Sequence, residues 1–253
     1  MRLSIDAICD KGLVRDTNQD MILVGTEMLR DQAKSYEFDF VSSDAPFIVA
    51  VADGMGGCQG GECASQLVAE GMKKAIGELP GNLDSTGLKC VLGEKIKSIH
   101  SLLLTQNGVT LETSEMGSTF VGLLFYNDGI FFINIGDSRL YRFRDGILVQ
   151  LSKDHSLAAV LDDPTMAKNI VINSFGGGER IFFDFEDISE RTFEGDVFLL
   201  CSDGLNSEVQ DEEIETILRN QDSHSLLVNH AKRKGGKDDM SVVVLKLISL
   251  CRR

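Results

Sequence analysis

Ten short runs of apolar, β-branched and aromatic residues dominate the sequence and limit the folds that the chain can form. Two pairs of neighbouring runs are joined by Asp-Gly, at Asn127–Gly129 and at Arg144–Gly146. Asn, Asp and Gly tolerate positive φ angles, so both joints predict β-hairpins, and we expect an antiparallel meander in the middle of the chain. The predicted strands are Leu3–Ile8, Met21–Gly25, Phe47–Ala52, Ser118–Phe125, Ile130–Ile135, Arg139–Phe143, Ile147–Leu151, Ile181–Phe185, Asp196–Cys201 and Ser241–Leu247.

Helical periodicity marks four further segments. Apolar residues recur at every third and fourth position in Cys63–Leu79 and Leu83–Leu104. A second pair of helical segments, Asp211–Arg219 and Ser223–Lys234, follows the strand that ends at Cys201. We predict an α+β fold in which two antiparallel β-sheets pack together and α-helices flank both outer faces, which is a four-layer α-β-β-α sandwich.

The length of the chain, 253 residues, fits one large domain, and neither an internal repeat nor a linker divides it. We therefore predict a single domain over residues 1–253. The segments Met28–Ala45 and Thr105–Met116 are predicted to be surface loops of that domain.

Charge and cysteine content narrow the classes of partner and the compartment. Twenty-five basic and 39 acidic residues give a formal net charge of −14. This argues against nucleic acid or an anionic membrane as a partner, because either would need a cationic face. Asp6 and Asp10 interrupt what would have to be the apolar core of a signal peptide. The six cysteines have no C-x-x-C spacing, so we expect reduced thiols in the cytoplasm rather than a zinc site or disulfides.

Aspartates stand at the ends of four predicted strands. Asp53 and Asp203 each follow an apolar run and precede a glycine, Asp20 begins a strand, and Asp238 lies just before another. A carboxylate at the end of a buried strand is costly unless it is paired or binds a cation. A single Asp-Gly is usually only a turn, but we expect these four carboxylates to meet at one rim of the fold.

The chemistry of this rim favours a hard cation. Oxygen ligands without histidine or cysteine select Mg²⁺ or Mn²⁺ over zinc or copper. Two such ions about 3.5–4 Å apart can activate a water molecule and hold the oxygens of an in-line displacement at phosphorus. Arg15 lies shortly before Asp20, and its planar guanidinium suits a bidentate contact with phosphate. The residues together predict hydrolysis of a phosphate ester.

Six segments form an ordered set that spans nearly the whole chain: Gly12–Asp20, Val51–Gly57, Gly117–Thr119, Asn134–Arg139, Leu200–Leu205 and Gly235–Ser241. The set resembles the signature motifs of the protein phosphatase 2C family, the metal-dependent serine/threonine protein phosphatases. The short length, Met55 and the Asn-x-Asp form of the first motif make the chain similar to bacterial-type members. The resemblance implies the same two-sheet fold, with a two-metal centre at one end.

The resemblance also implies which residues bind the metals. Asp53 would bridge both ions, Asp203 and Asp238 would complete the first, and the carbonyl of Gly54 would serve the second. Asp137 would belong to an additional, weaker metal site.

Two further roles and the mechanism follow from the same resemblance. Asp20 would hold metal-bound water, and Arg15 would bind the phosphate. The nucleophile would be a metal-bridging hydroxide, so that no phosphoenzyme intermediate forms.

Several positions depart from the family pattern. Gln19 stands where many members have glutamate, and Ser207 stands where an aspartate often helps to hold the third metal. Asp239 replaces the usual asparagine, and two adjacent carboxylates repel one another unless a cation or hydrogen bonds offset the charge. Met55 leaves the leaving-group oxygen without an obvious nearby acid. The segment Ala158–Ile172 is shorter than the usual flap, which bears on substrate choice.

We therefore predict a cytoplasmic, Mg²⁺- or Mn²⁺-dependent phosphatase for phosphoserine and phosphothreonine, whose partners are phosphoproteins made by a serine/threonine kinase. His155 is expected to be a structural hydrogen-bonding residue and Cys201 a core thiol. Two alternatives stay open. One is a phosphatase-like module that binds phosphoproteins with weakened turnover, and the other is a two-metal phosphodiesterase or nuclease, which the lack of a cationic groove disfavours.

Overall fold

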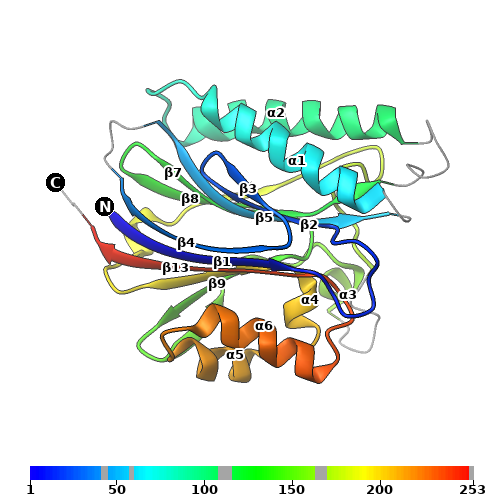
Figure 1. Ribbon diagram of the computed structural model, residues 1–253. Helices are drawn as coiled ribbons and strands as arrows, with labels where there is room; N and C mark the ends of the chain where they lie inside the picture. The colour runs from blue at the N-terminus through cyan, green and yellow to red at the C-terminus, as the bar shows by residue number, and fades with distance from the viewer. Residues whose placement is uncertain (41–44, 57–59, 108–115, 163–169, 251–253) are drawn as a thin grey trace.

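Two antiparallel β-sheets face one another at the centre of the molecule (Figure 1). The computed structural model describes residues 1–40, 45–56, 60–107, 116–162 and 170–250. The first sheet has the strand order β10-β9-β12-β13-β1-β4. Its strands are β1 (Arg2–Asp10), β4 (Gln32–Asp39), β9 (Arg139–Arg144), β10 (Ile147–Gln150), β12 (Val197–Cys201) and β13 (Met240–Ser249).

The second sheet has the order β11-β8-β7-β5-β2-β3, with β6 paired to the end of β5. Its strands are β2 (Asp20–Val24), β3 (Glu27–Leu29), β5 (Phe47–Met55), β6 (Gly117–Ser118), β7 (Phe120–Tyr126), β8 (Gly129–Ile135) and β11 (Asp184–Asp187). All seven residues of β7 are buried. Such a continuous apolar strand is expected where both faces of a sheet are covered.

Helices cover the outer face of each sheet. Helices α1 (Gly60–Gly77) and α2 (Ser85–Gln106) lie on the second sheet, whereas α5 (Asp211–Leu218) and α6 (Ser223–Lys234) lie on the first (Figure 1). Two short helices, α3 (Leu157–Leu161) and α4 (Asp203–Asn206), and a 3₁₀ turn at Ser189–Arg191 complete the described elements. In the described ranges, no helix is long and apolar enough to cross a membrane.

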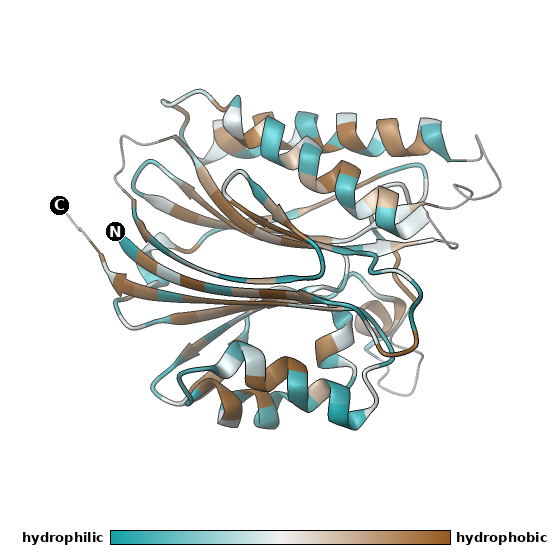
Figure 2. Cartoon of the chain, viewed as in Figure 1, coloured by the Kyte–Doolittle hydropathy of each residue, from teal (hydrophilic) through white to brown (hydrophobic). Residues whose placement is uncertain are grey.

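Three apolar clusters lie between the four layers. Hydrophobic residues, brown in Figure 2, recur along the strands of both sheets and along the helices. Inward-facing residues of β1, such as Leu3 and Ile5, alternate with more exposed ones and pack between the two sheets. Met72 of α1 belongs to the cluster beneath α1 and α2, and Leu227 of α6 to the cluster beneath α5 and α6. The predicted four-layer α-β-β-α sandwich is confirmed.

The predicted central meander is wrong, because its two hairpins belong to different sheets. The hairpin β7–β8 lies in the second sheet and the hairpin β9–β10 in the first. The chain crosses between the sheets at Gly136–Ser138, where Gly136 has a φ of 107°. A side chain is strained at that angle, so the glycine allows the crossing. The crossing carries Asp137 to the rim of the sandwich.

The predicted loop Met28–Ala45 is also wrong in part, because it contains the end of β3 and the whole of β4. Strand β4 is the outer strand of its sheet and pairs only with β1 among the described strands. Its residues are mostly exposed, so they lack the apolar pattern by which a buried strand is recognised in a sequence. The predicted loop Thr105–Met116 begins inside α2, and residues 108–115 of it lie outside the described residues.

Candidate metal centre

Four strand ends bring the predicted carboxylates to one end of the sandwich. Asp20 begins β2 and lies directly across from Asp53 of β5 in the antiparallel pair. Asp203 begins α4 just after β12, and Asp238 lies just before β13, the strand paired with β12. A pocket of about 250 Å³ opens here, and its lining residues are Arg15, Gln19, Asp53, Gly54, Met55, Gly56, Asp137, Val171, Asp203 and Asp238.

Asp53 is a carboxylate of this pocket on which the charges of several other aspartates act. Burial raises the pKa of its carboxyl well above the usual value, and the charges of Asp20, Asp203 and Asp137 raise it further. Burial also raises the pKa of Asp203, with a contribution from the charge of Asp238. Such a set of crowded carboxylates is stabilised by protons or by a cation.

Asp20 is buried behind the pocket, with 1% of its surface exposed. Ser202 Oγ donates a hydrogen bond of 2.7 Å to Asp20 Oδ2, and the Ser241 N–H donates to Ser202 Oγ over 2.9 Å. Burial raises the pKa of Asp20 to about 7, and the bond from Ser202 opposes this rise. Sequence reasoning gave Ser202 no role, although it directly precedes Asp203.

Arg30 is a second residue that sequence reasoning missed. Its Nε donates to the Asp20 carbonyl over 3.0 Å, and its Nη1 donates to Glu62 Oε1 over 3.0 Å. It also donates to Ser65 Oγ over 2.9 Å, so one side chain joins the start of β2 to the first turns of α1. Arg30 lies in a segment predicted as a loop, and the sequence carries no signal for these contacts.

Arg15 and Asp238 form a bidentate ion pair in this structure. Arg15 Nε donates to Asp238 Oδ1 over 2.8 Å, and Nη2 donates to Oδ2 over 2.7 Å. The two side chains are 41% and 40% exposed. The family resemblance implies that Arg15 binds phosphate and that Asp238 binds a metal, and a phosphate or a metal ion would each compete with this ion pair.

Asp239 explains one departure from the family pattern. Its Oδ1 accepts a hydrogen bond of 2.9 Å from the Gly12 N–H, and its Oδ2 accepts one of 2.8 Å from the Gln19 N–H. Burial raises the pKa of Asp239, and the two backbone hydrogen bonds oppose the rise. Hydrogen bonds therefore offset its charge, and they fix the Gly12–Asp20 segment against the start of β13.

Gly54 lies where its backbone is tightly enclosed. Its N–H donates to the Gln19 carbonyl over 3.1 Å. A Cβ at Gly54 would lie 2.0 Å from the Gly61 carbonyl oxygen, so only glycine fits at this position. The same close packing brings Gly54 and Gln19 against the start of α1.

Asp137 lies beside a second pocket, of about 260 Å³, lined by Asp137, Arg139, Asp154, Asp203, Asn206, Ser207 and Gln210. Burial raises the pKa of Asp137 to about 7, and the negative charges of Asp203 and Asp154 contribute to the rise. Asp154 is held by Arg139 Nη2 over 2.7 Å. Asn206 Oδ1 is buried and has no hydrogen-bond partner within the described part of the chain. Sequence reasoning did not identify this oxygen, which could serve as a cation ligand.

His155 has the structural role predicted for it. Its Nδ1 accepts hydrogen bonds from the Gly136 N–H over 3.1 Å and from Asn173 Nδ2 over 2.8 Å. Its Nε2 therefore carries the proton and faces Asp184 Oδ2 at 3.1 Å. Cys201 is fully buried, and burial raises the pKa of its thiol to about 12, which fits a core residue.

The donor set fits divalent cations, although the ligands are not arranged as a finished site. Within the described ranges, no three His, Cys, Asp or Glu side chains already share metal-binding geometry. Asp238 is engaged by Arg15, and the remaining carboxylates repel one another. Crowded carboxylate oxygens and a tightly placed glycine carbonyl are the ligand types that Mg²⁺ and Mn²⁺ prefer.

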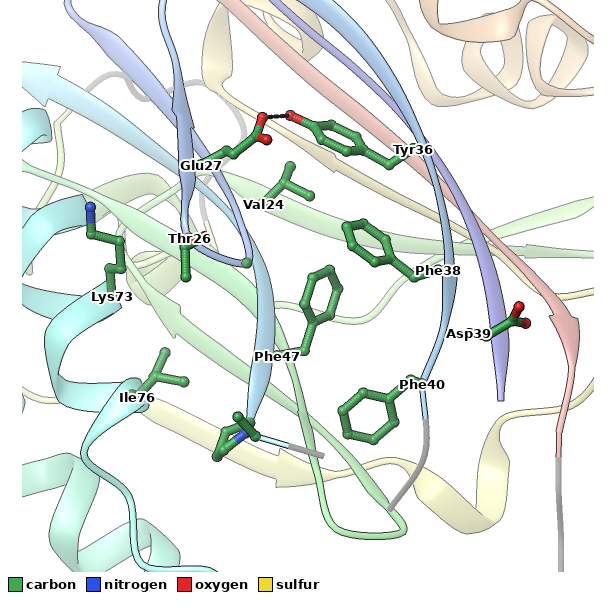
Figure 3. Close-up of a pocket in the computed structure, with 14 residues that line it drawn as sticks. Val24, Thr26, Glu27, Tyr36, Phe38, Asp39, Phe40, Phe47, Lys73 and Ile76 are labelled. Carbon is green, nitrogen blue, oxygen red and sulfur yellow. Dashed lines mark hydrogen bonds between the residues drawn. The ribbon is translucent and has the colours of Figure 1, made fainter. Parts of the chain in front are cut away.

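A larger pocket, of about 490 Å³, lies at the opposite end of the strands that present Asp20 and Asp53. Val24, at the end of β2, and Phe47, at the start of β5, line it together with Tyr36 and Phe38 (Figure 3). Its position separates it from the candidate metal centre.

The sequence profile of the protein phosphatase 2C family matches residues 33–242. The chain belongs to the protein phosphatase 2C family. It is 31% identical over 252 residues to the serine/threonine protein phosphatase PstP of Mycobacterium tuberculosis, covering 94% of this chain. The chain spans only 44% of the length of PstP. It is 28% identical over 221 residues to the serine/threonine phosphatase stp of Listeria monocytogenes, covering 82% of this chain and 87% of that protein.

A solved structure of a family member bears on the metals. The catalytic domain of the phosphatase PstP in complex with two manganese ions superimposes with a TM-score of 0.75 and 29% sequence identity. The match covers 98% of this chain and 100% of that one. The predicted resemblance to a bacterial-type protein phosphatase 2C is confirmed.

Proposed function

We propose that the chain is a Mg²⁺- or Mn²⁺-dependent phosphoprotein phosphatase that hydrolyses phosphoserine and phosphothreonine. The observation that carries this proposal is the pocket in which Asp53, Asp137, Asp203 and Asp238 converge next to Arg15. Burial and mutual repulsion raise the pKa of Asp53 well above its usual value, so the pocket favours a group of positive charge. The names of its relatives and the bound manganese of PstP agree with this chemistry.

The assignment of metal ligands is part of the proposal. Asp53 would bridge two cations, Asp203 and Asp238 would complete the first site, and the Gly54 carbonyl would serve the second. Asp137 would hold a weaker third ion. The cross-strand position of Asp53 and the close packing of Gly54 support the first two sites.

Cations held by these residues would lower the pKa of a water molecule and so supply a nucleophile for phosphorus, for which no phosphoenzyme would be needed. The chain's own residues position the reactants around them. Asp20 would orient that water. The hydrogen bond from Ser202 to its carboxylate and the one from Arg30 to its backbone carbonyl hold Asp20 in place. Arg15 would release Asp238 and present its guanidinium to the substrate phosphate, for which its planar shape is suited.

Partners and organisation are proposed on the same basis. The substrates would be phosphoproteins made by a serine/threonine kinase, in the cytoplasm, and residues 1–253 would form one catalytic domain. The short flap predicted at Ala158–Ile172 includes residues 163–169, which lie outside the described residues. Its first residues belong to α3, and Val171 lines the metal pocket.

One observation favours a second candidate, a phosphoprotein-binding module with weakened turnover. The Arg15–Asp238 ion pair occupies a predicted phosphate ligand and a predicted metal ligand at once. A module of this kind would keep the pair when Mn²⁺ is added.

Hydrolysis of a phosphothreonine peptide and of a small aryl phosphate, with and without Mn²⁺, separates these candidates. The phosphatase should cleave both substrates with Mn²⁺ and neither in chelator. Asp53→Asn should lower turnover by several orders of magnitude, since the amide removes charge from the cations. Asp187→Asn, at the exposed end of β11, is the matched control and should keep the parent rate. Binding of the peptide without Mn²⁺-dependent cleavage would instead identify the binding module.

A further inference from the structure

Leu13 and Val14 occupy the centre of a tight turn that directly precedes Arg15, a residue that lines the metal pocket. The Arg15 N–H donates to the Gly12 carbonyl over 3.4 Å and closes the turn. Val14 is 71% exposed and Leu13 is 62% exposed. Among the large hydrophobic residues that the structure describes, only Ile147 is as exposed as Leu13, and none is as exposed as Val14.

Backbone contacts hold the turn against the start of β13. The Gly12 N–H donates to Asp239 Oδ1 over 2.9 Å, and the Leu13 N–H donates to the Gly236 carbonyl over 2.8 Å. A Cβ at Gly12 would lie 2.6 Å from the carbonyl of Asp238, so the backbone approach is close. These contacts fix where the turn presents the two side chains, and such preorganisation lowers the entropy lost when a partner binds.

The residue types do not suit the turn or the fold. Gly, Pro, Asn, Asp and Ser dominate turn centres because their conformations or side chains stabilise the turn, and β-branched valine favours strands. Neither Leu13 nor Val14 has a positive φ, so the backbone of the turn could be formed by most other residue types. Their exposure also means that they add little to the apolar core. A local rule broken without benefit to the fold is expected at functional sites.

We propose that Leu13 and Val14 bind an apolar side chain adjacent to the phosphorylated residue of the protein substrate. This inference rests on the proposed phosphatase function. Val14 directly precedes Arg15, which lines the metal pocket. One residue of extended peptide spans about 3.3–3.6 Å, so the neighbours of a phosphoresidue bound at Arg15 would pass within a few residue lengths of this turn. The surface thus selects phosphopeptides with an aliphatic or aromatic residue next to the phosphoresidue.

Two phosphothreonine peptides that differ only in leucine or serine on both sides of the phosphothreonine test the proposal with Mn²⁺ present. The parent protein should favour the leucine peptide by about tenfold in kcat/KM, the factor that about 1.4 kcal/mol produces. The difference should lie mainly in KM. Leu13→Ser with Val14→Ser should abolish the preference, and Val14→Ser alone should reduce it. Ile147→Ser, at a position with the same 62% exposure as Leu13, should leave it intact.

The single Val14 variant matters because Leu13 Cδ1 packs near Gly236 and its loss can disturb that segment. Cleavage of an aryl phosphate reports on the reaction centre in every variant. If the parent cleaves both peptides equally, or if the double variant keeps the preference, the inference is overturned while the phosphatase function stands. If the parent cleaves neither peptide nor aryl phosphate with Mn²⁺, the proposed function fails and the inference falls with it.

Discussion

Replacing Ser202 by alanine removes one hydrogen bond to the buried carboxylate of Asp20 and one acceptor of the Ser241 N–H. Ser202 Oγ donates to Asp20 Oδ2 over 2.7 Å and accepts from the Ser241 N–H over 2.9 Å. Ser202 and Ser241 are fully buried, and Asp20 is 1% exposed. Alanine therefore leaves a buried carboxylate oxygen and a buried N–H without these partners.

The two losses set the expected magnitude. A hydrogen bond to a charged group contributes about 1.5–3 kcal/mol, and a buried donor left unpaired costs about 1–3 kcal/mol. We expect Ser202→Ala to lower the free energy of unfolding by about 3 kcal/mol at pH 8, near the low end of the sum. The loss should be smaller at pH 5, because burial raises the pKa of Asp20 to about 7 and its carboxyl is then protonated.

Urea unfolding of the metal-free protein at pH 5 and pH 8 measures both values. Ser35→Ala is the matched control, since Ser35 Oγ also donates to a carboxylate, Asp6 Oδ1, over 2.6 Å, but the pair is exposed. An exposed substitution of this kind should change stability by less than about 0.5 kcal/mol. A Ser202→Ala effect no larger than that of the control, or one that is larger at pH 5 than at pH 8, would refute the reasoning.

Three further outcomes are expected, together with a test of metal linkage. Burial raises the pKa of Asp20 and of Asp137 to about 7, above the value of about 4 in unfolded chains. The folded metal-free protein therefore keeps protons that the unfolded chain releases, and its urea midpoint should fall between pH 4 and pH 7. Saturating Mn²⁺ should remove this fall, and an unchanged slope would contradict the metal assignment. Ser207→Asp should lower the Mn²⁺ concentration needed for activity, as followed by titration, because a further carboxylate would join Asp137 at the proposed third site. Cys201→Ser should leave turnover within about twofold in a steady-state assay, since the thiol is buried and has no role in the proposed mechanism, whereas a trapped phosphocysteine would contradict this. Arg15→Ala should raise KM without weakening Mn²⁺ binding measured by calorimetry, because it frees a carboxylate from an ion pair; weaker metal binding with unchanged KM would place Arg15 in the metal shell.

Local patterns in the sequence were sufficient to predict most elements. The helix α6 has the predicted bounds, Ser223–Lys234, and apolar periodicity gives α1, α2 and α5 to within a few residues. The second hairpin turn also follows from its residues, since Asp145 and Gly146 have φ angles of 52° and 81°. These features depend on neighbours in sequence, and a single chain therefore displays them directly.

The exposed edge strand β4 and the two short helices were not predictable in this way. The polar residues of β4 pair with β1, and only the position of β1 in the folded sheet makes that pairing possible. The assignment of β8 and β9 to different sheets likewise depends on the crossing at Gly136–Ser138. Local propensity predicts neither the pairing of β4 nor the sheets to which β8 and β9 belong, because both depend on packing between distant segments.

The sequence by itself determined which carboxylates stand at strand ends, including Asp20, Asp53 and Asp203. Only the tertiary structure decided how each is held. Ser202 meets Asp20 across 182 positions of sequence, and Arg15 meets Asp238 across 223. Hydrogen bonds and ion pairs act over about 3 Å in space whatever the separation along the chain, so the fold alone determines which polar groups become partners.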